Sequence, residues 1–212
     1  MSKIKEVAEL VEKGKAKLVG AAVQAALDEG CDPMQILNEG MIDTMSVVGD
    51  KFKNGEIFVP EMLVAARAMK KGVEVLKPHL ATGSTGAQGK VIIATVAGDL
   101  HDIGKNLVAM MIESAGFEVV DLGVDVAADK IIEACKANPD TKIVCLSALL
   151  TTTMPALKDT VAALNAADFR SSIKVMVGGA PITQGFADEI GADGYSEDAA
   201  SAATRAKKLA AA

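Results

Sequence analysis

The strongest constraint on the fold is an alternation of strand and helix patterns that begins at residue 90 and continues almost to the last residue. Apolar runs bounded by small or charged residues predict strands at 90–97, 118–122, 143–147 and 174–177, with a short one near 194–195. Helical spacing of apolar residues predicts helices at 106–115, 127–136, 155–166, 186–190 and 199–209. Because neighbouring parallel strands need a crossover helix, this alternation predicts an α/β fold with a doubly wound parallel sheet, of the flavodoxin or Rossmann-like kind.

The first 80 residues carry helical patterns alone. Apolar residues recur at helical spacing over 4–11 and 18–27. Asp32-Pro33 is an N-cap followed by proline, and it opens a third helix that is expected to close near Asn54-Gly55. A last helix is expected to start at Pro60 and to stop at Pro78. Four such helices predict a four-helix bundle.

The change of pattern divides the chain into domains. We expect a helical domain at 1–80 and an α/β domain at 90–212. Between them, residues 81–89 read ATGSTGAQG and hold only small or polar side chains. Such a composition is typical of a flexible linker.

Composition excludes several function classes. Half of the residues are apolar, 24% are charged and the net charge is −6, which favours a globular fold and argues against nucleic acid as the main partner. No apolar run is long enough to predict a membrane-spanning helix, and the charged start MSKIKEVAELVEKGK is unlike a signal peptide. We therefore expect a cytoplasmic protein. Its three cysteines form no CxxC pair and are expected to be small buried residues.

Ligands of doubly wound sheets bind at the carboxyl ends of the strands, near a topological switch point. Glycines and polar residues gather where those ends are expected, at 98–104, 147–153 and 178–179. The loop GDLHDIGKN at 98–106 follows the first strand and holds His101, one of two histidines. Gly104 is expected to let the chain turn closely before the next helix.

The spacing of Asp99 and His101 suits a metal ligand. In an extended loop, residues two apart point the same way, so the carboxylate can reach Nδ1–H of the imidazole while Nε2 faces outward. A lone imidazole does not build a zinc site, which takes four ligands, whereas a macrocycle with four in-plane ligands needs one axial ligand. The alternative is a capping aspartate beside a structural histidine. GDLHDIG is also not GxGxxG, so a nicotinamide site is weakly supported.

The motifs resemble one family in order and spacing. DLHDIG fits the DxHxxG signature of cobalamin-binding domains, SALLT at 147–151 matches their S-x-L region, and Gly178-Gly179 matches their GG element. MSVVGDKFKNGEIFVPEMLVAARAMK at 45–70 looks like the helical cap that precedes such domains. The chain is thus similar, over roughly 30–200, to corrinoid proteins of methyltransferase systems and to the cap and cobalamin-binding domains of methionine synthase.

The resemblance implies roles at the loop. His101 would be the lower axial ligand of cobalt, in place of the cofactor's own dimethylbenzimidazole, and Asp99 would hydrogen-bond His101. Thr153 stands where the family has a serine behind that aspartate, and it keeps the hydroxyl. Further loop residues expected to contact the cofactor are Gly98, Asp102, Ile103 and Gly104.

The resemblance also assigns residues outside the loop. The slot for the displaced nucleotide tail would be lined by Ser147, Leu149 and Thr151, and approached closely by the backbone at Gly178 and Gly179. The upper face of the corrin would be covered by Phe52, Val59 and Met62, with Val59 smaller than the leucine of methionine synthase. Each residue has a structural alternative: a strand end that caps the next helix, a turn, or the core of the bundle.

The implied function is that of a non-autonomous methyl carrier in anaerobic one-carbon metabolism. Its cofactor would be cobalamin, as methylcobalamin or hydroxocobalamin. One methyltransferase would load the methyl group, a second would unload it to tetrahydrofolate or a thiol, and a reductive activator would rescue Co(II). The alternatives are an adenosylcobalamin-dependent mutase subunit, a corrinoid light sensor, and a flavodoxin-like interaction module without cofactor. The sequence leaves the methyl donor, the acceptor and the oligomeric state open.

Overall fold

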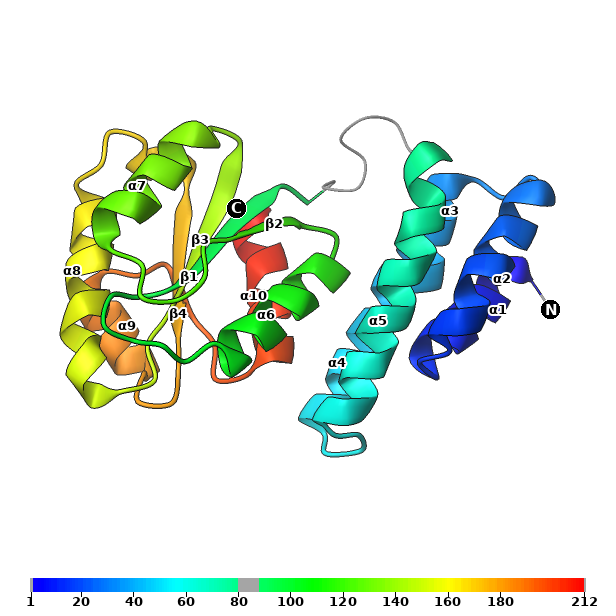
Figure 1. Ribbon diagram of the computed structural model, residues 1–212, viewed down its shortest axis with the longest axis horizontal. Coiled ribbons are helices and arrows are strands. Elements are labelled where there is room, and N and C mark those ends of the chain that lie inside the picture. The colour runs from blue at the N-terminus through cyan, green and yellow to red at the C-terminus, as the bar shows by residue number, and fades with distance from the viewer. Residues whose placement is uncertain (1, 80–87, 212) are drawn as a thin grey trace. The chain divides into compact units, whose positions relative to one another are not determined.

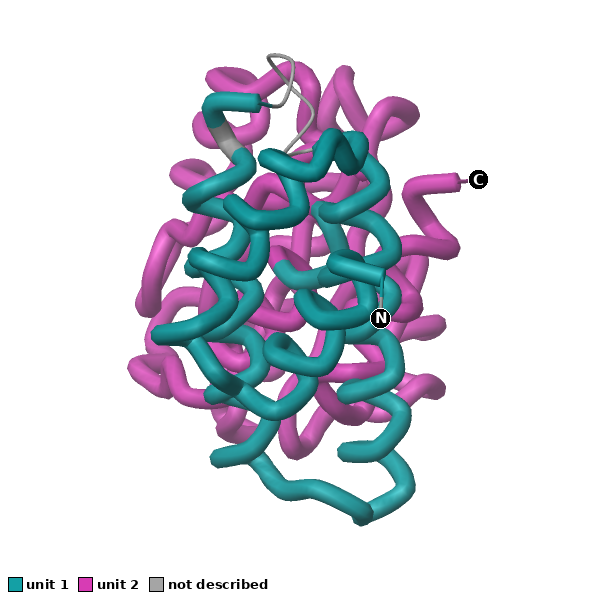
Figure 2. The backbone as a smooth tube through the Cα atoms, turned by 90° about the vertical axis from the view of Figure 1, so that its right-hand side faces the viewer, with its two compact units in different colours: residues 1–87, 114–116 teal, residues 88–113, 117–212 magenta. Residues whose placement is uncertain are grey.

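The protein folds as two compact units in the computed structural model, which describes residues 2–79 and 88–211. One unit comprises residues 1–87 with 114–116, and the other 88–113 with 117–212 (Figure 2). Residues 81–87 of the linker predicted at 81–89 lie outside the described residues, so the linker stays a prediction. In the described part of the chain, no helix is long and apolar enough to cross a membrane.

Among the described residues 2–79, the first unit has helices and turns but no strand. They are α1 (Lys3–Glu12), α2 (Ala16–Asp28), α3 (Pro33–Leu37), the π-helical turn Asn38–Ile42, α4 (Asp43–Lys53), α5 (Val59–Leu76) and the short 3-10 turn Lys77–His79 (Figure 1). Asp32 is the N-cap of α3, because its carboxylate accepts a hydrogen bond from the Gln35 N–H at 2.9 Å. Since α3, the π-helical turn and α4 follow one another without a break, four helical segments form the unit, as the sequence predicts.

The π-helical turn was not predicted, and the apolar pattern explains it. Leu37, Met41 and Met45 are buried and stand at intervals of four residues. A regular α-helix rotates such a row by about 40° at each step, away from the core. A wider turn at 38–42 holds more residues and keeps all three side chains on the buried face.

The second unit is a five-stranded sheet with helices on both faces. The strands are β1 (Lys90–Thr95), β2 (Glu118–Asp121), β3 (Thr141–Ser147), β4 (Lys174–Gly178) and β5 (Gly194–Tyr195). All strand pairs are parallel, in the order β2-β1-β3-β4-β5. The main helices are α6 (Ile103–Ser114), α7 (Ala128–Ala137), α8 (Met154–Asn165), α9 (Gln184–Ile190) and α10 (Ala199–Ala210). Figure 1 shows α7, α8 and α9 on one face and α6 and α10 on the other, which confirms the predicted fold class.

The register of the central strands brings their carboxyl ends into line. Thr95, the last residue of β1, lies opposite Ser147, the last residue of β3, and Ser147 lies opposite Gly178 at the end of β4. The strand cores are apolar and buried, so this register is fixed by packing on both faces of the sheet. The loops that follow β1, β3 and β4 therefore meet at one edge.

Gly179 fixes how the loop after β4 lies against the loop after β3. Its φ is +128°, and a Cβ built at this position would lie 1.9 Å from the carbonyl oxygen of Ala148. The glycine is thus required by the protein's own backbone. This reason differs from the expected close approach to a nucleotide tail, which stays a prediction.

We predict that Gly179→Ala lowers the free energy of unfolding of the sheet unit by about 3 kcal/mol or more, because backbone strain and overlap with a carbonyl oxygen add together. Gly123→Ala is the control: Gly123 has φ +88° but open space around the added Cβ. It should cost about 1 kcal/mol. Urea unfolding followed by the fluorescence of Tyr195 in β5 measures both, since the sequence holds one tyrosine and no tryptophan. Equal losses in the two variants would contradict the account.

Candidate functional site

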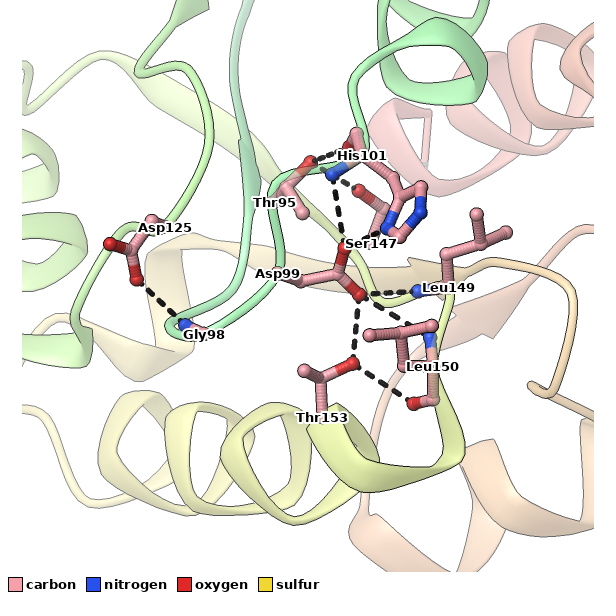
Figure 3. A network of polar contacts seen from close by, with 9 residues as sticks. All are labelled: Thr95, Gly98, Asp99, His101, Asp125, Ser147, Leu149, Leu150 and Thr153. Atoms are coloured by element: carbon pink, nitrogen blue, oxygen red, sulfur yellow. Dashed lines mark hydrogen bonds and ion pairs between the residues drawn. The ribbon is translucent and has the colours of Figure 1, made fainter.

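The candidate site lies at the carboxyl edge of the sheet, where the loop after β1 turns sharply. Gly98 has φ +80°, and its N–H donates to Oδ1 of Asp125 at 2.7 Å (Figure 3). The N–H of Asp99 donates to the carbonyl of Val96, and its carbonyl accepts from the N–H of Asp125 at 3.0 Å. These bonds hold the backbone of Asp99 so that its side chain points into the protein.

The carboxylate of Asp99 is fully buried and joins two loops. Its Oδ1 accepts from the backbone N–H of His101 at 3.1 Å and lies 2.7 Å from Nδ1 of the same residue. Its Oδ2 accepts from the N–H of Leu149 at 2.7 Å, from the N–H of Leu150 at 3.4 Å and from the Thr153 hydroxyl at 2.8 Å (Figure 3). The predicted contact of Asp99 with His101 and Thr153 is therefore present in the geometry.

These hydrogen bonds keep Asp99 ionised. Burial alone would raise the pKa of its carboxyl, but the hydrogen bonds from Leu149, His101 and Thr153 outweigh burial and hold the pKa well below its usual range. Because an ionised carboxylate only accepts hydrogen bonds, Nδ1 of His101 must carry the hydrogen of the 2.7 Å contact. The tautomer of the imidazole is thus set by Asp99.

The free nitrogen of His101 faces outward. The side chain is 49% exposed although its aspartate partner has no exposed surface. Within the described residues, Nε2 makes no hydrogen bond, so its lone pair is available to a ligand. An exposed imidazole with a buried carboxylate behind it is the arrangement found behind many metal-bound histidines.

Large apolar side chains surround this histidine and are not covered. Leu100 is 72% exposed and Ile103 is 85% exposed, one on each side of His101 in the chain. Leu149 and Leu150, whose N–H groups bind Asp99, are 42% and 41% exposed. Exposed aliphatic residues concentrated around one polar group are typical of a binding surface for a largely apolar ligand.

Two hydroxyl groups under the loop complete the site. Oγ1 of Thr95 donates to the carbonyl of His101 at 2.9 Å, and it lies 2.9 Å from Oγ of Ser147 (Figure 3). Thr95, Asp125 and Leu150 were missed by the sequence analysis. No sequence signal pointed to Thr95 or Asp125, because each side chain bonds to a backbone group.

The other expected loop residues lie at the same edge, with one correction. Asp102 is exposed and accepts from Asn106, and Thr151 is exposed in the 3-10 turn Thr151–Thr153. The prediction that the chain turns at Gly104 before the helix is wrong. Helix α6 begins at Ile103, so Gly104 is already its second residue. The helix start was placed too late because the side chain of Ile103 faces away from the core. A Cβ at Gly104 would meet no atom within 4 Å.

The expected cap residues lie in the helical unit. Phe52 is partly exposed near the end of α4, and Val59 is 39% exposed at the start of α5. Met62 has no exposed surface and is a core residue of this unit. The assignment of all three residues to a cofactor stays a prediction.

The side chains of the site that could bind a metal suit a metal that is already held by a macrocycle. Among residues 2–79 and 88–211, no group of three or more histidine, cysteine, aspartate or glutamate side chains is placed to hold a metal ion. A single outward imidazole in apolar surroundings cannot enclose a bare ion, but it can supply one axial ligand to a metal held by a macrocycle.

Comparison with known sequences matches both units to families that bind vitamin B12. Residues 89–204 match a family described as a B12 binding domain, and residues 3–77 match a second family with the same description. The chain is 48% identical to trimethylamine corrinoid protein 2 of Methanosarcina acetivorans, over 88% of this chain and 86% of that protein. It is 44% identical to dimethylamine corrinoid protein 1 of the same organism, over 97% and 96%.

A solved structure has the same fold over nearly the whole chain. It is the methanol:cobalamin methyltransferase complex MtaBC from Methanosarcina barkeri, which the chain matches with a TM-score of 0.85 and 32% identity. The match covers 99% of this chain and 80% of that one.

We predict that Asp99 contributes stability that depends on pH. Its folded pKa lies below the unfolded value of about 4, so its contribution is complete above about pH 4 and is lost as the pH falls below that. Asp99→Asn should lower the free energy of unfolding by about 2 kcal/mol at neutral pH, because it removes hydrogen bonds to a charged acceptor. The gap to the wild type should narrow below about pH 4.

Urea unfolding of the cofactor-free protein at a series of pH values, read by Tyr195 fluorescence, measures that gap. Asp102→Asn, in the exposed part of the same loop, is the control and should change the stability little. A gap that stays constant from neutral to acidic pH would contradict the role given to Asp99.

Proposed function

The chain belongs to the B12-binding corrinoid proteins of methyltransferase systems, and from this premise we infer that it carries methyl groups on a bound cobalamin. It works with methyltransferases, and we expect no complete catalytic cycle from this chain alone. The observation that carries the proposal is His101, whose imidazole is exposed among apolar side chains while Nδ1 is held by a buried carboxylate. When bound, cobalamin supplies a cobalt ion that takes up a methyl group and gives it up again.

We assign to His101 the lower axial position on cobalt, through Nε2. Asp99 holds the proton on Nδ1, which leaves the lone pair of Nε2 free for the metal. Thr153 donates to the other oxygen of Asp99 and keeps that carboxylate in place. Asp99 and Thr153 would thus keep the imidazole in one tautomer and one orientation toward the metal.

The loop around His101 is the proposed seat of the corrin. Leu100 and Ile103, which precede and follow His101 in the chain, offer exposed apolar surface in this loop. A Cβ at Gly104 would meet no protein atom within 4 Å. This open space supports the proposed contact of Gly104 with the corrin, because a side chain there would take up room that the cofactor needs. Gly98, Asp102 and Ile103 are proposed to contact the cofactor from the same turn.

The displaced nucleotide tail is proposed to lie at the carboxyl ends of β3 and β4. Ser147, Leu149 and Thr151 would line its slot, and Gly178 with Gly179 would allow the backbone to come close. The amide of Leu149 is already bonded to Asp99, so the contact of this residue with the tail would be through its exposed side chain.

The helical unit is proposed to cover the other face of the corrin between methyl transfers. Phe52, Val59 and Met62 are the residues assigned to this cover. The exposed apolar surface of Phe58, 69%, and of Val59 supports the assignment, since Phe58 directly precedes α5 and Val59 is its first residue. Methyl transfer would require this unit to move away so that a partner enzyme can reach the cobalt.

The relatives support a proposal for the enzyme that loads this protein. We propose that the methyltransferase that loads this protein acts on a methylamine, because the identities of 48% and 44% are to trimethylamine and dimethylamine corrinoid proteins, against 32% to the methanol complex. A second methyltransferase would pass the methyl group to tetrahydrofolate or a thiol, and a reductive activator would return Co(II) to Co(I). The proposal includes a cytoplasmic location.

The relatives also discriminate between the competing functions. Corrinoid proteins of methyltransferase systems match over nearly the full length of this chain. This favours methyl transfer over an adenosylcobalamin-dependent mutase subunit, a light sensor and a module without cofactor.

We predict that His101→Gly binds cobalamin without imidazole ligation. After anaerobic reconstitution with hydroxocobalamin and removal of free cofactor, the wild type should be a red protein with stoichiometric cobalamin. The absorption spectrum of His101→Gly should shift, because Nε2 is absent from the cobalt. His79→Gly is the matched control, since His79 is the other histidine and lies in the helical unit. A colourless wild type, or a spectrum unchanged in His101→Gly, would overturn the assignment.

We further predict that a methylamine-specific methyltransferase methylates the bound cobalamin faster than a methanol-specific one does. The reconstituted protein is reduced to Co(I) and mixed with either enzyme and its substrate, and methylation is followed in the visible spectrum. At least a ten-fold preference is the expected result, equivalent to about 1.4 kcal/mol of discrimination. A preference for methanol would contradict the donor class while leaving the carrier function intact.

A further inference from the structure

A second set of hydrogen bonds holds His101, and it acts on the main chain rather than the ring. Thr95 ends β1 and is 1% exposed, directly beneath the loop. Its hydroxyl donates to the carbonyl oxygen of His101 at 2.9 Å (Figure 3). The ligand residue is therefore fixed at two places, its Nδ1 by Asp99 and its carbonyl by Thr95.

The direction of the neighbouring bond follows from counting hydrogens. A hydroxyl has one hydrogen, and that of Thr95 points to the His101 carbonyl. In the 2.9 Å contact between Thr95 Oγ1 and Ser147 Oγ, Ser147 must then be the donor. The two residues lie opposite each other in the register of β1 and β3. The pairing of the two strands therefore holds the Ser147 hydroxyl beside Thr95.

We propose that Thr95 is a positioning residue for the axial ligand, and that Ser147 orients the Thr95 hydroxyl. This inference rests on the proposed function, because it takes His101 as the cobalt ligand. Ser147 donates to Thr95, which donates to the His101 carbonyl. Separately, the Thr153 hydroxyl and Nδ1 of the His101 ring both donate to Asp99. Ser147 thus serves the ligand loop from the end of β3, besides any contact with the nucleotide tail.

The two anchors have different consequences when removed. Without Asp99, Nδ1 of the imidazole loses its hydrogen-bond partner, and the position of the ring hydrogen is no longer fixed. Without the Thr95 hydroxyl, the ring keeps Asp99, but the backbone at residue 101 is free to shift and its carbonyl loses a hydrogen bond. The ligated form should therefore become less favoured relative to the unligated form, with cobalamin still bound.

The test compares Thr95→Val with Thr95→Ser in the full chain loaded with cob(II)alamin. Valine has the shape of threonine without the hydroxyl, whereas serine restores it. The readout is the ratio of imidazole-ligated to unligated cobalt, taken from the visible spectrum at a temperature where both forms are populated. Electron paramagnetic resonance identifies the nitrogen-ligated form. Thr95→Val should lower the ratio about five-fold, the loss of one net hydrogen bond, and Thr95→Ser should restore it to within about two-fold of the wild type.

Thr141→Val is the matched control. Thr141 is also a buried threonine of the sheet, 2% exposed, and its hydroxyl donates to the carbonyl of Asn138 at 2.7 Å. It lies at the opposite end of β3, so its loss should reduce stability without changing the ligation ratio.

Ser147→Ala keeps the test falsifiable if Thr95→Val fails to fold. It leaves Thr95 bonded to the loop but removes the donor that orients it, so the ratio should fall about two-fold. If Ser147 served the nucleotide tail alone, this variant would bind cobalamin more weakly at an unchanged ligation ratio, which would overturn its place in the proposal.

The remaining outcomes separate the two levels of inference. A wild type that shows no imidazole ligation overturns the proposed function itself. A wild type that is ligated, with Thr95→Val at the same ratio, overturns the positioning role alone. A ratio that falls in Thr95→Val and is not restored in Thr95→Ser also overturns it, because the effect would then come from strand packing.

Discussion

The buried carboxylate of Asp99 is the interaction on which the rest of the site depends. A charge without exposed surface costs several kcal/mol unless hydrogen bonds replace its water. Asp99 obtains these bonds from its own loop and from the loop after β3, so its carboxylate ties the two loops together. Burial and hydrogen bonding thus fix Asp99 and His101, which are close neighbours in the sequence, in one arrangement at the edge of the sheet.

The sheet supplies the second half of this arrangement. Because β1, β3 and β4 end in register, the hydroxyls of Thr95 and Ser147 meet beneath the histidine, and Gly179 allows the next loop to close against Ala148. Every group that holds His101 therefore comes from a strand end or a loop fixed to one. An imidazole held in place in this way would reduce the entropic cost of binding a cofactor.

Much of this was predictable from the sequence, for identifiable reasons. The alternation of patterns fixes the sheet, and the spacing of Asp99 and His101 indicates their contact. Thr153 was placed only by family resemblance, because its partner lies far away in the sequence. Thr95 and Asp125 were missed since each acts through a backbone group, and backbone hydrogen bonds leave no mark on side-chain patterns. The π-helical turn and the early start of α6 were missed because apolar spacing assumes regular helices with buried faces.

The account stands on one bond that the chain itself would make, from Nε2 of His101 to cobalt. Its most direct test labels all histidines with the heavy isotope of nitrogen and loads the protein with unlabelled cob(II)alamin. In electron paramagnetic resonance, the nitrogen splitting of the cobalt signal should change from a triplet to a doublet, because the axial ligand is then a labelled imidazole. A triplet that persists would mean that the cofactor's own dimethylbenzimidazole is the ligand, and the central claim would be wrong.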